Sequence, residues 1–316
     1  MDISILLNGL LPVFGIMLLG FFLKKRVLKE DAHWVPIEKI TFVVLIPSFI
    51  ISTLAGADMS AIDVWPVVLT LLLALFTTIV LLIFLYPSLT RKQRNKIAAY
   101  TSLFQTSTRF NGFVALALVA NLFGETEIAI VALGLITLMP VINIVNITML
   151  TGLLTDKKLS LPTVLGKILT NPIILGCLIG ILINLSGIPL WEPLSESLGM
   201  LGKASLSITL LSVGAGLQLS NLEATRKKLI LSCLLKLIIL PGLVAGFGLA
   251  FELQGIELII VMIIASMPTA ANGYILAREM GGDAPLYANA SSLQVLLSIV
   301  TIPLWIEIAH RLQSGY

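Results

Sequence analysis

Charged residues are scarce in this chain of 316 amino acids. Asp, Glu, Lys and Arg make up 12% of it, about half of their share in a typical soluble domain. Hydrophobic residues make up 57%, and the formal net charge is only +3. The basic residues are scattered and form no run interleaved with aromatic residues, so the sequence does not indicate a nucleic-acid-binding protein. The composition is that of an integral membrane protein in a lipid bilayer.

Cysteine and histidine are also rare, and their positions argue against metal or redox chemistry. Cys177 and Cys233 lie inside apolar stretches, where free cysteine behaves as a small hydrophobic residue. His33 and His310, the only histidines, lie at the ends of predicted spans. The chain contains no HExxH, GxSxG or phosphate-loop motif. We therefore expect that the protein binds no metal or cofactor and is not an enzyme. We expect its energy to come from gradients or from a partner protein.

The hydrophobic residues gather in ten stretches, each near the roughly 20 residues that a membrane-spanning helix needs. Asp2 opens the first stretch where a signal peptide would have basic residues, and no small-residue cleavage site follows, so we expect a retained span. The connections are too short to hold a soluble domain. The sequence predicts an all-α integral membrane protein with spans at residues 3–23, 37–55, 65–87, 97–123, 127–151, 163–186, 197–219, 229–251, 256–278 and 286–308.

The two halves of the chain repeat each other at a nearly constant offset. Matching residues 160 positions apart include Pro12 with Pro172, Gly20 with Gly180 and Gly56 with Gly216. The segment 111–113 (Asn-Gly-Phe) matches 272–274 (Asn-Gly-Tyr) at an offset of 161, and Pro140 matches Pro303 at 163. With five spans in each half, the second copy is inverted in the bilayer. Inverted repeats of this kind, here 1–155 and 160–316, are typical of secondary transporters.

The basic residues orient the predicted spans. Sixteen of the 20 follow odd-numbered spans and so share one side of the membrane, whereas Arg311 alone lies on the other. By the positive-inside rule that side is cytoplasmic, which places both termini outside. Trp34, Trp65, Trp191 and Trp305 lie near span ends, as interfacial anchors do. The sixteen are Lys24, Lys25, Arg26, Lys29, Lys39, Arg91, Lys92, Arg94, Lys96, Lys157, Lys158, Lys167, Arg226, Lys227, Lys228 and Arg278.

Three basic residues remain inside the predicted spans. Lys203 and Lys236 lie a turn or two from span ends, so we expect both to extend toward a headgroup layer. Arg109 lies near the middle of span four, where insertion costs at least about 2.5–3.5 kcal/mol. No Asp or Glu lies at a comparable depth. An anionic substrate, backbone carbonyls or water are the partners that we consider for Arg109.

Two segments at matching repeat positions predict interrupted helices. Residues 105–112 are strongly polar for a mid-membrane segment, and 266–273 contain Pro268, which removes a helical donor and disfavours helix before it. Asn and Gly weaken both segments further. Opened backbone at this depth is tolerated where it lines a cavity or is buried in protein, and the N-termini of half-helices favour an anion such as a carboxylate. Ordinary kinks are the alternative to a binding site.

The site residues predicted from these segments fall into three groups. The substrate-binding group is Arg109, Asn111, Gly112, Asn272, Gly273 and Tyr274. The crossover or hinge group is Pro268, Gly112 and Gly273. Oxygen-bearing side chains that would bind a coupling ion are those of Gln105, Thr106 and Gln294.

With these residues in hand, the chain resembles the auxin efflux carrier family, which includes plant PIN-type auxin carriers and bacterial malonate-type carriers. The segment 268–277 (PTAANGYILA), followed by Gly281-Gly282-Asp283, looks typical of bacterial members, as does 109–124. The resemblance implies that broken helices four and nine cross at mid-membrane and that Asn111 and Asn272 help to hold a carboxylate. It also implies an elevator motion of spans 3–5 and 8–10 against a homodimeric scaffold of spans 1, 2, 6 and 7.

The chain departs from this family at two points. Many relatives carry Gly and Pro shortly after the span-four break, where this chain has Ala115 and Ala117, so Gly112 alone would set the break. The long cytoplasmic loops of the plant carriers are absent, so their regulation by loop phosphorylation is not expected here.

The leading hypothesis is a secondary active or facilitative transporter of small organic anions in a bacterial inner membrane. The anions would be mono- or dicarboxylates, including auxin-like acids. A sodium-coupled transporter of an amphipathic or neutral solute, with an architecture like that of bile-acid transporters, is the alternative. Proton coupling is disfavoured because it usually needs a carboxylate in the membrane, and Glu252, Glu257 and Asp283 lie near the surfaces. The short loops offer no docking module for a receptor.

Overall fold

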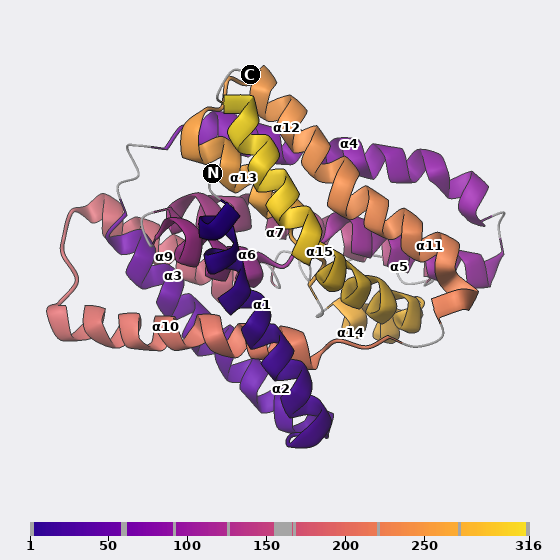
Figure 1. Cartoon of the computed structure of the whole chain (residues 1–316), viewed down its shortest axis with the longest axis horizontal. Coiled ribbons are helices and arrows are strands. Elements are labelled where there is room, and N and C mark those ends of the chain that lie inside the picture. Colours follow the sequence, from indigo (N-terminus) through magenta and orange to yellow (C-terminus); the bar gives the residue numbers. More distant parts are fainter. Residues whose placement is uncertain are drawn as a thin grey trace. The chain divides into compact units, whose positions relative to one another are not determined.

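The computed structural model describes residues 3–57, 62–90, 93–124, 127–154, 166, 169–219, 222–270 and 273–313, and all regular structure in these ranges is helical (Figure 1). The first half of the chain forms α1 (Ile3–Arg26), α2 (Asp31–Ile40), the π-helical turn η1 (Thr41–Leu45), α3 (Ile46–Ala55), α4 (Val64–Thr90), α5 (Arg94–Thr108), α6 (Gly112–Phe123) and α7 (Ile128–Leu154). The second half forms α9 (Pro172–Ser186), α10 (Glu192–Ala215), α11 (Leu222–Leu234), the π-helical turn η3 (Leu235–Ile239), α12 (Leu240–Ala250), α13 (Gly255–Ser266), α14 (Gly273–Met280) and α15 (Ala284–Gln313).

Six helical segments in the described part of the chain are long and apolar enough to cross a membrane. The helices α9 and α13 are apolar but shorter. An α-helical membrane protein is therefore confirmed, whereas the count of ten spans and the inverted arrangement stay predictions. The six segments are Asp31–Ala55, Val64–Thr90, Ile128–Leu154, Glu192–Ala215, Thr225–Ala250 and Ala284–Gln313.

The helices group into two compact units, which the chain enters more than once. The first unit is Met1–Asp63, Gly112–Ile136 and Leu165–Gly216, and the second is Val64–Asn111, Thr137–Val164 and Leu217–Tyr316. The first therefore holds α1 to α3, α6, the start of α7, α9 and α10. The second holds α4, α5, the rest of α7 and α11 to α15. The chain passes from one unit to the other at Asn111, inside the interruption predicted for span four.

Backbone-to-backbone contact between α1 and α10 holds the first unit together. A Cβ atom added to Gly20 would lie 2.0 Å from the carbonyl oxygen of Leu211, and one added to Gly214 would lie 1.7 Å from that of Met17. Both distances are far below van der Waals contact, so each position requires glycine. Close approach of this kind is how small residues join helices in a membrane. Gly20 is therefore a packing residue of α1, and Gly214 is its counterpart on α10.

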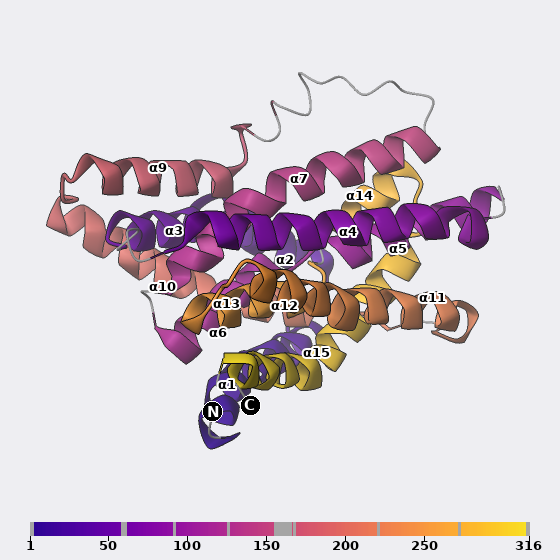
Figure 2. The same ribbon diagram turned by 90° about the horizontal axis from the view of Figure 1, so that it is seen from above.

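In the second unit, α4 runs beside a rod formed by α11, η3 and α12 (Figures 1 and 2). The short helix α13 packs against α12 and α15, and its residues from Glu257 to Ser266 are all buried. A helix that is apolar on every side is expected to be enclosed by others. The π-helical turn η3 precedes Pro241 by two residues, as η1 precedes Pro47. Proline disrupts the regular helical ladder, and π-helical turns are a common local adjustment.

Several sequence expectations can be compared directly with this fold. Cys177 and Cys233 are free and buried, as expected of inert thiols. Trp65 and Trp191 are exposed, but Trp305 is buried and donates from Nε1 to the carbonyl oxygen of Leu237 at 2.7 Å. Trp34 is buried as well, so the prediction that all four tryptophans are interfacial anchors is wrong for two of them. Five of the sixteen orienting cations lie outside the described residues, namely Arg91, Lys92, Lys157, Lys158 and Lys167.

Candidate functional site

The first interruption follows directly on α5. The hydroxyl groups of Thr106, Ser107 and Thr108 each donate to the carbonyl oxygen four residues earlier, at 3.0, 2.8 and 2.9 Å. Such back-bonding competes with the helical ladder and weakens a helix locally. Arg109 then adopts an extended backbone (φ −74°, ψ 153°), and helix resumes as α6 at Gly112. Gly112 is buried and belongs to the first unit.

The second interruption follows α13. Met267 is extended (φ −61°, ψ 138°), the conformation favoured before a proline such as Pro268. The chain is non-helical through Ala270, and α14 begins at Gly273. Asn272, a predicted substrate residue, lies outside the described residues. Pro268 and Gly273, two of the three predicted hinge residues, thus lie where one helix ends and the next begins.

Hydrogen bonds join the two interruptions within the second unit. The backbone N–H of Asn111 donates to the carbonyl oxygen of Pro268 at 2.8 Å. The hydroxyl of Thr269 donates to the carbonyl oxygen of Thr106 at 2.7 Å. Backbone groups released from one helix are therefore satisfied by the other, as buried polar backbone requires. The two breaks form one connected element rather than two separate kinks.

The side-chain amide of Gln294, on α15, bonds to both interruptions. Its Oε1 accepts from the backbone N–H of Thr269 at 2.9 Å. Its Nε2 donates to the carbonyl oxygen of Thr106 at 3.0 Å and to the hydroxyl oxygen of Ser232 at 2.9 Å. The hydroxyl groups of Ser232 and Thr106 are themselves 2.8 Å apart. Two of the three predicted ion ligands, Thr106 and Gln294, therefore lie together, with both ends of the Gln294 amide engaged in hydrogen bonds.

Gln105, the third predicted ion ligand, faces Arg109 instead. Arg109 is buried, and its Nε donates to Gln105 Oε1 at 3.3 Å while Nη1 donates to Asn143 Oδ1 at 3.3 Å. Both partners are neutral side-chain amides, and no ion pair to Arg109 is found in the described ranges. Gln105 Nε2 is buried with no hydrogen-bond partner among the same residues. Arg109 is thus a buried cation held by long hydrogen bonds, and its charge is not neutralised by a carboxylate there.

The start of α14 is fitted closely around Tyr287 of α15. The Tyr287 hydroxyl donates to the carbonyl oxygen of Ala270 at 2.6 Å. A Cβ atom added to Gly273 would lie 2.2 Å from the same hydroxyl oxygen, so this position requires glycine. Tyr274, predicted to bind substrate, is partly buried and packs against the cluster of Ala277, Ala284 and Tyr287, while its ring lies 5.8 Å from the guanidinium carbon of Arg278. The structure therefore places Tyr274 on α14, packed toward α15.

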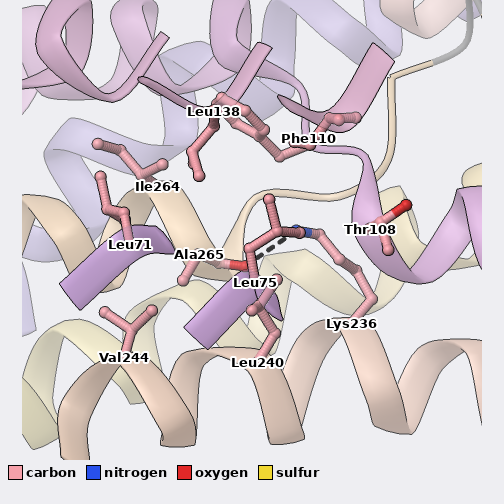
Figure 3. A pocket seen from close by; sticks show the side chains of 11 residues that line it. Leu71, Leu75, Thr108, Phe110, Leu138, Lys236, Leu240, Val244, Ile264 and Ala265 are labelled. Atoms are coloured by element: carbon pink, nitrogen blue, oxygen red, sulfur yellow. Dashed lines mark hydrogen bonds between the residues drawn. The ribbon is translucent and has the colours of Figure 1, made fainter. Parts of the chain in front are cut away.

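Lys236 shows where one expectation is wrong. Its side chain is 1% exposed, and its ammonium group donates to the carbonyl oxygen of Ala265 at 3.2 Å, so it does not extend toward a headgroup layer. Lys203, by contrast, is exposed on α10. Lys236 borders a cavity of about 20 Å³ below the first interruption (Figure 3). The cavity is lined by Lys236, Thr108, Phe110, Ala265, Leu71, Leu75, Leu138, Ile142, Leu240, Val244 and Ile264.

Sequence reasoning missed several residues that contribute to this element. Asn143 and Asn146 are one helical turn apart on α7, a polar pair in an apolar stretch that could have been noticed. Asn146 Nδ2 donates to the hydroxyl oxygen of Thr108 at 3.1 Å. Ser232 and Tyr287 carry no comparable signal, because single serines and tyrosines are common at apolar helix contacts.

The comparisons with known proteins agree with the features described above. The family model described as membrane transport protein matches residues 5–306. A protein of Methanothermobacter thermautotrophicus named as an uncharacterized transporter is 25% identical over 303 residues, which cover 93% of this chain and 95% of that protein. The uncharacterized transporter YfdV of Escherichia coli K12 is 22% identical over 319 residues, covering 98% of this chain and 99% of YfdV. The chain therefore belongs to this family of membrane transport proteins, the auxin efflux carriers, and is a transporter rather than an enzyme.

Proposed function

We propose that this chain carries small organic anions, mono- or dicarboxylates including auxin-like acids, across a bacterial inner membrane with both termini outside. The observation that carries the proposal is Arg109, a buried cation whose hydrogen bonds in the described ranges go only to the neutral amides of Gln105 and Asn143. A buried charge is costly unless it is paired. A carboxylate bound beside Arg109 supplies the missing charge.

Groups near Arg109 suit the remaining oxygens of such an anion. Asn111 is buried at the first interruption, and Gly273 opens α14 at the second. The first N–H groups of a helix are unsatisfied within it and carry a partial positive charge, which favours an anion. In the proposal, Arg109 attracts the anion, Asn111 and Asn272 orient its oxygens, and the N-terminus of α14 with Gly273 and Tyr274 completes the site.

We also propose that transport follows an elevator motion, with a homodimer supplying the stationary part. Support comes from the grouping of α1 to α3, α9 and α10 in one compact unit and of α4 and α11 to α15 in the other. An elevator motion needs such a division into a stationary and a moving part. The helix α6 and the start of α7 are an exception, because they are grouped with the first unit although the motion would assign spans four and five to the moving part.

A sodium-coupled carrier of an amphipathic or neutral solute is the second candidate. The observation that favours it is a small cluster of oxygens: the hydroxyls of Thr106 and Ser232 are 2.8 Å apart, and the Thr269 hydroxyl is 2.7 Å from the carbonyl oxygen of Thr106. Gln294 Nε2 bonds to two of these oxygens. Hard cations prefer oxygen ligands of this kind. Against it, the Gln294 amide is already engaged at both ends.

The test is current from the purified protein in proteoliposomes on a solid-supported membrane. Concentration jumps of malonate, malate, lactate and indole-acetate are applied with and without a sodium gradient. A saturable current that Arg109→Gln weakens supports anion transport. Unchanged affinity and rate in Arg109→Gln would contradict it, and a current that requires sodium would favour the second candidate.

A further inference from the structure

Lys236 is the second buried cation of the second unit, and the proposed anion site does not use it. It lies in the π-helical turn η3, between α11 and α12. Its side chain is 1% exposed, and among the described residues its ammonium group makes one hydrogen bond, to the carbonyl oxygen of Ala265. A lysine ammonium has three donors. Two of its N–H groups are thus left without an acceptor in the part of the chain that the structure describes.

The interruption after α13 explains why the carbonyl of Ala265 is available. In a continuous helix this oxygen would accept from the N–H of Thr269, four residues later. Here the N–H of Thr269 donates to Gln294 Oε1 instead, at 2.9 Å. The released carbonyl lies at the C-terminal end of α13, where the helix dipole favours a positive charge. Lys236 therefore bonds to a carbonyl oxygen that is available because the helix is interrupted.

The cavity beside Lys236 has room for water next to its side chain. Figure 3 shows the side chain reaching from its helix toward Ala265, among apolar side chains of neighbouring helices. The cavity volume of about 20 Å³ is room for a single water molecule. Besides Lys236, Thr108 carries the one other polar side chain in the lining. A water molecule in this cavity can exchange a proton with the Lys236 side chain that lines it.

The lining of this cavity includes no counter-ion for Lys236. The other ten lining side chains are not ionisable. Arg109 is next in sequence to Thr108 and Phe110, which line the cavity. Its guanidinium group bonds to Gln105 and Asn143 instead of lining the cavity. The helices that pack around η3 or line the cavity carry further titratable groups. These groups lie outside the cavity lining, and none of them bonds to Lys236. They are Tyr86, Lys96, Tyr100, Glu223, Arg226, Lys227, Lys228, Cys233, Glu257, Tyr287, Glu307, His310 and Arg311.

We propose that Lys236 is a proton-binding site of this carrier and takes the place of the intramembrane carboxylate that the sequence lacks. The lone pair of the neutral amine accepts a proton from a hydronium ion that reaches the cavity, giving ammonium and one water, and the reverse step returns the proton. The neutral amine can also donate to the carbonyl oxygen of Ala265, but the ammonium adds a positive charge that the C-terminal dipole of α13 favours, so proton binding stabilises the end of α13 in its interrupted form. Coupling of this proton to an organic anion rests on the proposed function. Proton binding and release by Lys236 do not depend on the proposed function.

The test uses the full chain in proteoliposomes on a solid-supported membrane, with pH jumps and no organic acid present. Wild-type protein is expected to give a transient charge displacement that saturates with pH, because the proton enters partway across the membrane. Lys236→Gln and Lys236→Arg are expected to reduce it at least tenfold, since glutamine binds no proton and arginine does not release one. Lys203→Gln, at an exposed lysine of α10, is the matched control and retains the wild-type signal.

Three results would overturn the proposal. One is a wild-type signal that persists in folded Lys236→Gln or Lys236→Arg. Another is no signal in folded, inserted wild-type protein, which makes Lys236 a permanent cap on Ala265. The third is loss of the signal when chloride is replaced by sulfate, which would identify an anion site instead. A pH-jump signal without any organic-acid current would refute the proposed function but retain the proton site.

Discussion

Replacing Gln294 by methionine tests whether the two interruptions are held by one amide. Methionine has a similar volume, so the change removes hydrogen bonds while leaving little empty space. The carbonyl oxygen of Thr106 keeps its bond from the Thr269 hydroxyl, and the Ser232 hydroxyl keeps its contact with that of Thr106. Only the backbone N–H of Thr269 loses its acceptor.

One buried donor left unsatisfied costs about 1–3 kcal/mol. We therefore expect Gln294→Met to lower the free energy of unfolding by about 2 kcal/mol, which is about 30-fold in the unfolding equilibrium constant. The matched control is Ser298→Ala, one turn along α15. The hydroxyl of Ser298 donates only to the carbonyl oxygen of Val295 in the same helix, so its loss leaves no buried donor without a partner.

The measurement is reversible unfolding of the detergent-solubilised protein, together with hydrogen exchange of a peptide covering residues 266–270. Faster exchange at Thr269 is expected in Gln294→Met and not in Ser298→Ala. If both variants show the same stability and the same exchange, Gln294 does not hold the interruption and the reasoning is wrong.

Three further changes test other parts of the structure. Arg109→Gln removes the charge proposed to meet the anion and is expected to raise the half-saturating concentration of a transported acid at least about tenfold, the effect of losing a charged hydrogen bond; currents from Lys203→Gln should match wild type. Gly20→Ala places a Cβ atom 2.0 Å from a carbonyl oxygen of α10 and is expected to cost about 1–3 kcal/mol of unfolding free energy, whereas Gly15→Ala meets nothing within 4 Å and should be near neutral in the same unfolding assay. Tyr287→Phe removes the 2.6 Å hydrogen bond to the carbonyl that precedes α14; it should cost about 1 kcal/mol and speed hydrogen exchange at the start of α14, and unchanged exchange would argue against a role in holding that helix.

The positions of both interruptions could be predicted from sequence because they depend on local backbone chemistry. Proline removes a donor, and glycine and asparagine weaken a helix, wherever they lie. The contacts that hold the interruptions could not be predicted, because their side chains come from α7, α11 and α15 and meet only on packing. Gln294 was predicted as an ion ligand and not as the amide that joins the two interruptions, and Ser232 gave no signal at all.

The error over Lys236 has a geometric cause. Distance from a span end gives depth along a helix but not the face on which a side chain lies. A π-helical turn adds one residue to a turn, which shifts the following positions by about 100° relative to a regular α-helix. Lys236 lies inside such a turn. Trp305 was misjudged for the related reason that depth alone does not tell whether a ring faces lipid or protein.

The burial of both native cysteines has a practical consequence for the study of this carrier. Cys177 and Cys233 are free thiols enclosed by other side chains, with 0% and 7% of their surface exposed. Water-soluble maleimides therefore have little access to them in the folded protein. Wild-type protein is already a low-background template for single-cysteine labelling, so accessibility changes or spectroscopic distances during transport can be measured without first replacing residues in the cores of α9 and α11.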